Sequence, residues 1–209
     1  MLGIHDFGVF IATGVLLNLT PGQDTLYIVG RSITQGRSVG VVSALGISAG
    51  VIIHTLAAAL GLSAILATSA SAFIVLKLVG AAYLIYLGVC MLVARKTSAV
   101  VTAATGSVSR AVAFRQGVLT NVTNPKVALF FLAFLPQFID PDSPTKVVAF
   151  LVLGLTFLIT GTVWCLILAV SAAHVRDFLS IRSRPAALLS RATGVLFIAL
   201  GLRLAASKP

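Results

Sequence analysis

Long apolar stretches joined by short polar connectors make up nearly the whole chain. No charged residue lies between Arg37 and Lys77, and between Lys146 and Arg176 only His174 and Cys165 carry ionisable groups. Both stretches exceed the roughly 20 apolar residues that a helix needs to cross a bilayer. Because hydrocarbon supplies no water to the backbone, segments of this kind are expected to satisfy their polar groups internally as helices. The pattern therefore predicts an all-α membrane protein.

Six transmembrane helices are predicted, with ends uncertain by several residues: about 4–31, 39–62, 73–93, 115–135, 147–172 and 187–204. The sixth contains Arg191 and Arg203, whose long side chains reach a membrane interface by snorkelling. Residues 1–209 are expected to form a single transmembrane domain. Its halves are about 1–96 and 110–209, and a linker of about 97–109, rich in Ser, Thr, Ala and Val, joins them as a flexible tether.

Two of the predicted spans are interrupted by proline. The first break is at Thr20-Pro21-Gly22, and the fourth span is broken at Asn124-Pro125. Proline removes a backbone donor and disturbs the preceding turn. Membrane proteins keep such breaks where the backbone lines a cavity, and paired breaks in two halves point to a transporter binding site. Three spans on each side of the linker predict a 3+3 inverted repeat with helices one and four broken.

Charge is scarce and unevenly distributed. Only 10% of the 209 residues are charged, against 58% hydrophobic, whereas a soluble domain carries about 25% charged residues. The net charge of +10 does not indicate a nucleic-acid partner, since the basic residues cluster in connectors, such as Arg31 and Arg37 after span one. The odd-numbered connectors are the basic ones, which predicts that they are cytoplasmic and that both termini lie outside.

Asp24 follows the first break directly. An ionised carboxylate deep in a bilayer costs on the order of several kcal/mol unless it is paired or hydrated. Either Asp24 binds a substrate ammonium or a coupling proton, or it caps the free amides at the start of a half-helix. The two roles are compatible, and the sequence leaves both open.

Lys126 follows the second break. It either forms a structural salt bridge with Asp24 or helps to hold a substrate carboxylate beside the amides of a half-helix N-terminus. An amino acid has one ammonium and one carboxylate, so a cavity between Asp24 and Lys126 would complement it.

Neutral polar side chains surround both breaks and either satisfy the interrupted backbone or meet the substrate. The predicted substrate-binding set is Asp24, Asn124, Lys126, Asn121, Thr20 and Gln23, and the residues that break the helices are Pro21, Gly22 and Pro125.

His54 lies four residues after Gly50 and eight after Gly46, so the three share one face of a helix. The glycines are interpreted as a close-packing face, or as one that slides during transport. The imidazole is either a hydrogen-bonded interior group or a proton relay, because histidine changes charge near neutral pH. Proton coupling is therefore assigned to Asp24 and His54.

Other kinds of chemistry find no support in the sequence. There is no Glu, the three His are scattered, and no P-loop is present. Cys90 and Cys165 have no metal-ligand spacing and are interpreted as small hydrophobes packed between helices. Neither an enzyme, nor a metal, nor a cofactor is expected.

Taken together, these motifs resemble those of the lysine exporter superfamily, in its homoserine/threonine exporter branch (LysE/RhtB-type). Pro21-Gly22-Gln23-Asp24 is similar to the branch's PGPD-type signature, with Gln23 where the family usually has proline, and Asn124-Pro125-Lys126 is similar to its second signature. The resemblance runs nearly end to end. It implies export of small amino acids across the bacterial inner membrane, driven by the proton gradient.

The sequence thus predicts a secondary active exporter of small neutral amino acids such as threonine, homoserine or leucine. Its expected partners are the amino acid, protons and the lipid bilayer, and a homo-oligomer remains open. The alternative is a channel-like permease for small solutes, which saturable, proton-sensitive efflux against a gradient would exclude.

Overall fold

The computed structural model describes residues 2–68, 70–93 and 108–172, together with a few positions between 195 and 206. These residues form helices, and within them the extended pairing is limited to one isolated bridge between Ile4 and Ile139. The all-helical class is confirmed. Most of the sixth predicted span, 187–204, and most of the predicted linker, 97–109, lie outside the described residues.

The first predicted span is two helices, α1 (Phe7–Leu19) and α2 (Gln23–Gln35), separated at the predicted Thr20-Pro21-Gly22 break. The second predicted span corresponds to α3 and its continuation, and the third to α5. α3 (Arg37–Ala57) runs through a π-helical turn, η1 (Ala58–Leu62), into α4 (Ser63–Thr68), and α5 (Ala70–Val93) follows.

The fourth predicted span is also broken. α6 (Arg110–Val122) ends before Thr123, and α7 (Pro125–Leu129) continues through a π-helical turn, η2 (Phe130–Phe134), into a 3₁₀ turn, η3 (Leu135–Phe138). The two parts of this segment are bent by 47°. Pro125 is the first residue of α7, where its missing N–H costs nothing. The fifth span is the single helix α8 (Lys146–Ala172).

Two described helices are long and apolar enough to cross a membrane, Arg37–Ile65 and Lys146–Ala172, and the bent α6–η3 segment is a third if it counts as one span. Phe7–Leu19 is apolar but shorter. The six-span count and the inverted repeat therefore remain predictions.

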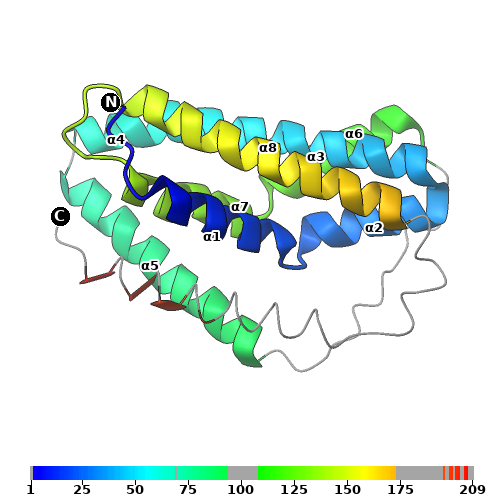
Figure 1. Cartoon of the computed structure of the whole chain (residues 1–209), viewed down its shortest axis with the longest axis horizontal. Helices are drawn as coiled ribbons and strands as arrows, with labels where there is room; N and C mark the ends of the chain where they lie inside the picture. Colours follow the sequence, from blue (N-terminus) through cyan, green and yellow to red (C-terminus); the bar gives the residue numbers. More distant parts are fainter. Residues whose placement is uncertain are drawn as a thin grey trace.

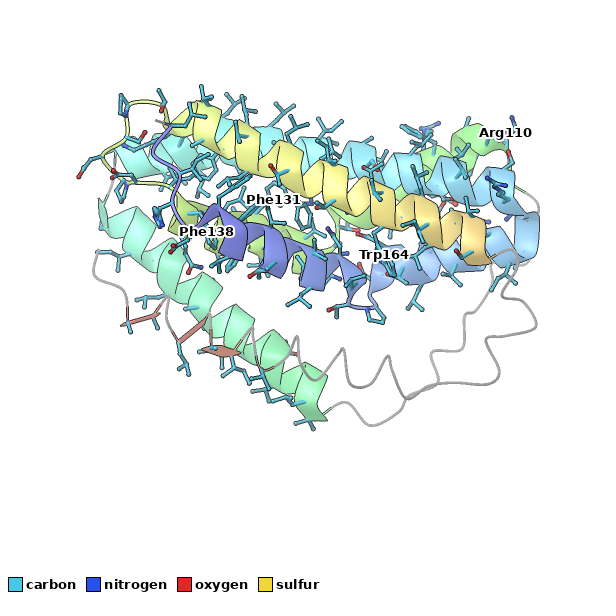
Figure 2. All side chains as sticks on the ribbon, in the orientation of Figure 1. Arg110, Phe131, Phe138 and Trp164 are labelled. Carbon is cyan, nitrogen blue, oxygen red and sulfur yellow. The ribbon has the colours of Figure 1, made fainter. Side chains whose placement is uncertain are left out.

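α3 and α8 run side by side along the length of the molecule (Figure 1). α1 and α2 lie end to end, α1 against α8 and α2 against both α3 and α8. At one end, a cluster of six phenylalanine rings fills the space between α1, α8 and the α7–η3 segment. Ring centroids lie 4.7 Å apart for Phe130–Phe157 and 4.8 Å for Phe134–Phe138, and the other members are Phe10 and Phe131. Figure 2 shows Phe131 and Phe138 in this region.

The predicted close-packing face of α3 is confirmed. A Cβ on Gly117 of α6 would lie 2.6 Å from the carbonyl oxygen of Ser43, and one on Gly50 would lie 2.7 Å from the Asn121 side chain. Gly46 meets the backbone of Phe114 in the same crossing. The glycines thus allow α6 to approach α3 closely.

The prediction that Arg31 lies in the connector after span one is wrong. α2 continues to Gln35 and α3 begins at Arg37, so the connection between them is the single residue Gly36, which has a φ of +86°. Arg31 is buried within α2, where it donates a hydrogen bond of 2.6 Å to Oε1 of Gln116 and lies over the ring of Tyr27. A long side chain can bury its apolar stem while its charge finds a partner on a neighbouring helix, which charge counting along a sequence does not detect.

Candidate functional site

The two helix breaks meet. Nζ of Lys126, in the first turn of α7, donates hydrogen bonds to the carbonyl oxygens of Leu17, at 3.1 Å, and Thr20, at 3.0 Å. The Leu17 carbonyl lies in the last turn of α1, where it also accepts from the Thr20 amide at 3.2 Å, and Thr20 is the residue after that helix. Helix ends leave carbonyl groups short of intrahelical donors. The cation also suits the negative end of the α1 dipole. The two interruptions, far apart in the sequence, therefore lie together in the fold.

Local sequence places Lys126 for this contact. Asn124 is 2% exposed and caps α7, its Oδ1 accepting from the Lys126 amide at 3.0 Å. On the opposite side, a Cβ on Gly22 would lie 3.1 Å from Nζ of Lys126. A larger residue at position 22 would crowd the ammonium, so the glycine in the first break serves the lysine that follows the second.

Asp24 makes the corresponding contact in the other direction. Its Oδ2 accepts a hydrogen bond of 2.8 Å from Nδ2 of Asn121, in the last turn of α6. Its Oδ1 is buried and has no hydrogen-bond partner among the described residues. Among the described residues the carboxylate accepts no hydrogen bond from the α2 amides, because Oδ2 bonds Asn121 and Oδ1 has no partner. Asp24 nevertheless lies in the first turn of α2, where a negative charge suits the helix dipole.

A small cavity lies where the breaks meet. Its volume is about 30 Å³, and its walls come from α1, α2, α7 and α8: Leu17, Asn18, Asp24, Thr25, Lys126, Val127, Phe157, Trp164 and Cys165. Asp24 and Lys126 both line it, yet within the described chain they form no salt bridge. The space suits one or two water molecules. Ligand pockets usually measure roughly 300–1,000 Å³, so this cavity is too small to hold an amino acid.

His54 supports the site from α3. Its Nε2 lies 3.1 Å from the carbonyl oxygen of Asn121, and its ring stacks on Phe131 with centroids 5.7 Å apart. A carbonyl only accepts hydrogen bonds, so Nε2 carries the proton in this contact. Asn121, which is 1% exposed, bonds His54 through its backbone carbonyl and Asp24 through its side chain, so it links the two residues.

The predicted substrate-binding set separates into three groups. Asp24 and Lys126 line the cavity. Asn121, Asn124 and Thr20 are buried around it and hold those two charges in place through hydrogen bonds. Gln23 is exposed at the start of α2 and does not line the cavity.

The cavity wall formed by α8 was not predicted from the sequence. Phe157, Trp164 and Cys165 complete the cavity, and Figure 2 shows Trp164 beside α8, near where α1 gives way to α2. The available signal was Trp164 itself, the single tryptophan of the chain within an apolar stretch, because a buried indole N–H normally needs a partner. Cys165 lines the cavity, and the packing prediction was wrong for Cys90, which is exposed on α5.

Comparison with known proteins places this chain in a family. The LysE type translocator model matches residues 15–208. The chain belongs to the LysE-type translocator family. The translocator is 33% identical over 208 residues to an uncharacterized membrane protein of Pseudomonas aeruginosa, covering 98% of this chain and 96% of that one. It is also 29% identical over 203 residues to a leucine efflux protein of Salmonella typhimurium, covering 97% and 96% respectively.

A further relative of the translocator is an uncharacterized membrane protein of Vibrio cholerae, 32% identical over 212 residues, covering 99% of this chain and 100% of that one. No solved structure matches the translocator. Family membership and the apolar helices identify the chain as an integral membrane transporter.

Proposed function

We propose that this translocator is a secondary active exporter of small neutral amino acids, such as threonine, homoserine or leucine, across the bacterial inner membrane, driven by the proton gradient. The observation that best supports the proposal is the placement of Asp24 and Lys126 on one cavity without a salt bridge between them. Family membership and the relatives named leucine efflux proteins support the substrate class.

The free hydrogen-bonding capacity of the two charges matches an amino acid. Oδ1 of Asp24 is an unused buried acceptor, which suits an ammonium. Lys126 uses two donors on Leu17 and Thr20, and an ammonium has three. Its third N–H is available to a carboxylate.

Coupling to protons follows from competition for one carboxylate. In the proposed cycle, Asp24 binds either the substrate ammonium or a proton, so that release of one on the outer side allows binding of the other. The His54 ring, held through Nε2, is proposed to exchange protons through its other nitrogen.

The proposed cycle includes alternating access, because a cavity of about 30 Å³ admits an amino acid only after the surrounding helices separate on one side. The 3+3 inverted repeat would supply two similar halves for that movement. The orientation proposed from the loop charges places the basic odd-numbered connectors in the cytoplasm and both termini outside.

The deciding experiment measures amino acids inside and outside bacterial cells that overexpress the protein, with and without an uncoupler. The proposal expects extracellular leucine, threonine or homoserine to rise above the intracellular level and to collapse with the uncoupler. Efflux that only follows the concentration gradient and ignores the uncoupler would support the channel-like permease instead. Unchanged levels of every amino acid would overturn both.

A further inference from the structure

The indole N–H of Trp164 is a buried hydrogen-bond donor without an acceptor among the described residues. The side chain lines the same cavity as Asp24 and Lys126. Buried polar groups are nearly always paired, and an unpaired one costs about 1–3 kcal/mol. An unpaired indole N–H on a transporter cavity therefore indicates a hydrogen bond to a ligand.

Placement in the helix argues against an interfacial role. Tryptophan often lies at the membrane surface with its N–H in the headgroup region. Trp164 precedes Ala172, the last described residue of α8, by eight positions, which corresponds to about 12 Å along a helix. Its N–H is buried against the cavity, so the aromatic-belt explanation does not account for it.

The unused groups on the cavity form a consistent set. In the described part of the chain, two buried side-chain atoms on the cavity have no partner, the acceptor Oδ1 of Asp24 and the donor Nε1 of Trp164. Nζ of Lys126 has a third N–H beyond its bonds to Leu17 and Thr20, which makes a second donor. An amino-acid zwitterion offers one ammonium and two carboxylate oxygens. The two donors match the two oxygens, and the acceptor matches the ammonium.

We propose that Trp164 is a substrate-binding residue whose indole N–H donates to one carboxylate oxygen of the transported amino acid while Lys126 holds the other. This inference rests on the proposed export function. An indole N–H only donates, so it cannot bind the ammonium, and it thereby sets the orientation of the substrate. The apolar lining, Leu17, Val127 and Phe157, then receives an apolar side chain.

Trp164→Phe tests the inference, because it removes the N–H and keeps an aromatic ring. Uptake of leucine is measured in inside-out vesicles, with leucinamide, which lacks the carboxylate, as a competitor. The KM for leucine is expected to rise about tenfold, as for the loss of one hydrogen bond to a charged group. The kcat and the inhibition constant of leucinamide should change little. Tyr86→Phe, at an exposed aromatic of α5, is the control and should leave the KM unchanged.

A second readout needs no variant. Trp164 is the chain's only tryptophan, so the tryptophan fluorescence of the purified protein reports this site alone. Leucine should change it saturably, with a midpoint near the KM.

The outcomes separate the two proposals. Wild-type vesicles that take up none of the candidate amino acids would overturn the export function. Leucine transport with an unchanged KM in Trp164→Phe would overturn only the role of Trp164. If that variant does not fold, a wild-type fluorescence signal that ignores saturating leucine overturns it equally.

Discussion

Lys126 reaches the carbonyl oxygen of Thr20 across 3.0 Å, so a residue after the second helix break closes the end of the helix before the first. Asp24 does the reverse, accepting from Asn121 at 2.8 Å near the end of α6. Both residues are the second residue of a half-helix. The two breaks are therefore held together by reciprocal contacts, one through a cation and one through an anion.

Lys126→Met is expected to lower both stability and export. The carbonyls of Leu17 and Thr20 lose their charged donor, and hydrogen bonds to charged groups contribute about 1.5–3 kcal/mol each. Because the Leu17 carbonyl keeps the Thr20 amide as a donor, the expected loss is that of the one bond to Thr20, about 1.5–3 kcal/mol. It is measured as a lower melting temperature in lipid nanodiscs. Lys146→Met, at the start of α8, is the control. If both variants melt at the same temperature, Lys126 does not hold the breaks together.

Asp24→Asn should separate folding from function. Asparagine keeps an oxygen acceptor for the Asn121 amide, so stability is expected to change by less than about 1 kcal/mol. Without the negative charge the ammonium loses its partner, and efflux of the substrate is expected to fall at least about tenfold. Radiolabelled efflux from loaded cells measures it, with Asp142→Asn in an exposed loop as control. Wild-type efflux and pH dependence in Asp24→Asn would remove Asp24 from the mechanism.

Gly50→Ala is expected to damage the site from a distance. The added Cβ would lie 2.7 Å from Cβ and Oδ1 of Asn121, displacing the residue that bonds Asp24. Overpacking of this kind costs about 1–3 kcal/mol, and efflux should fall with it. Gly8→Ala is the matched control, because nothing lies within 4 Å of its Cβ, and alanine there should stabilise α1 by up to about 1 kcal/mol. Equal melting temperatures and equal efflux in the two variants would contradict the close packing of α3 on α6.

His54→Gln distinguishes support from proton exchange. Glutamine offers an amide N–H to the Asn121 carbonyl but does not titrate. The proposal expects a folded protein whose efflux depends less on pH than that of the wild type, because glutamine cannot exchange a proton. Efflux is measured at several pH values in vesicles with a fixed proton gradient. An unchanged pH profile would limit His54 to its hydrogen bond and its stacking on Phe131.

The sequence predicted the membrane helices and both breaks because these depend on local chemistry. An apolar stretch is helical in lipid wherever it lies in the fold, and Pro21 and Pro125 disrupt a helix regardless of their neighbours. Arg31 shows where that local reasoning ends. Its placement in a connector came from counting charge along the chain, and its actual burial depends on Gln116, a residue of another helix.

By itself, the sequence determined that the protein is built from membrane helices, that two of them are interrupted, and that Asp24 and Lys126 follow the interruptions. Only the tertiary structure decided that Lys126 bonds the end of α1, that Asp24 bonds Asn121, and that α8 brings Trp164 to the same cavity. The reason is physical: a helix break follows from the residues beside it, whereas the partner of a buried polar group is whichever group packing brings within hydrogen-bonding distance.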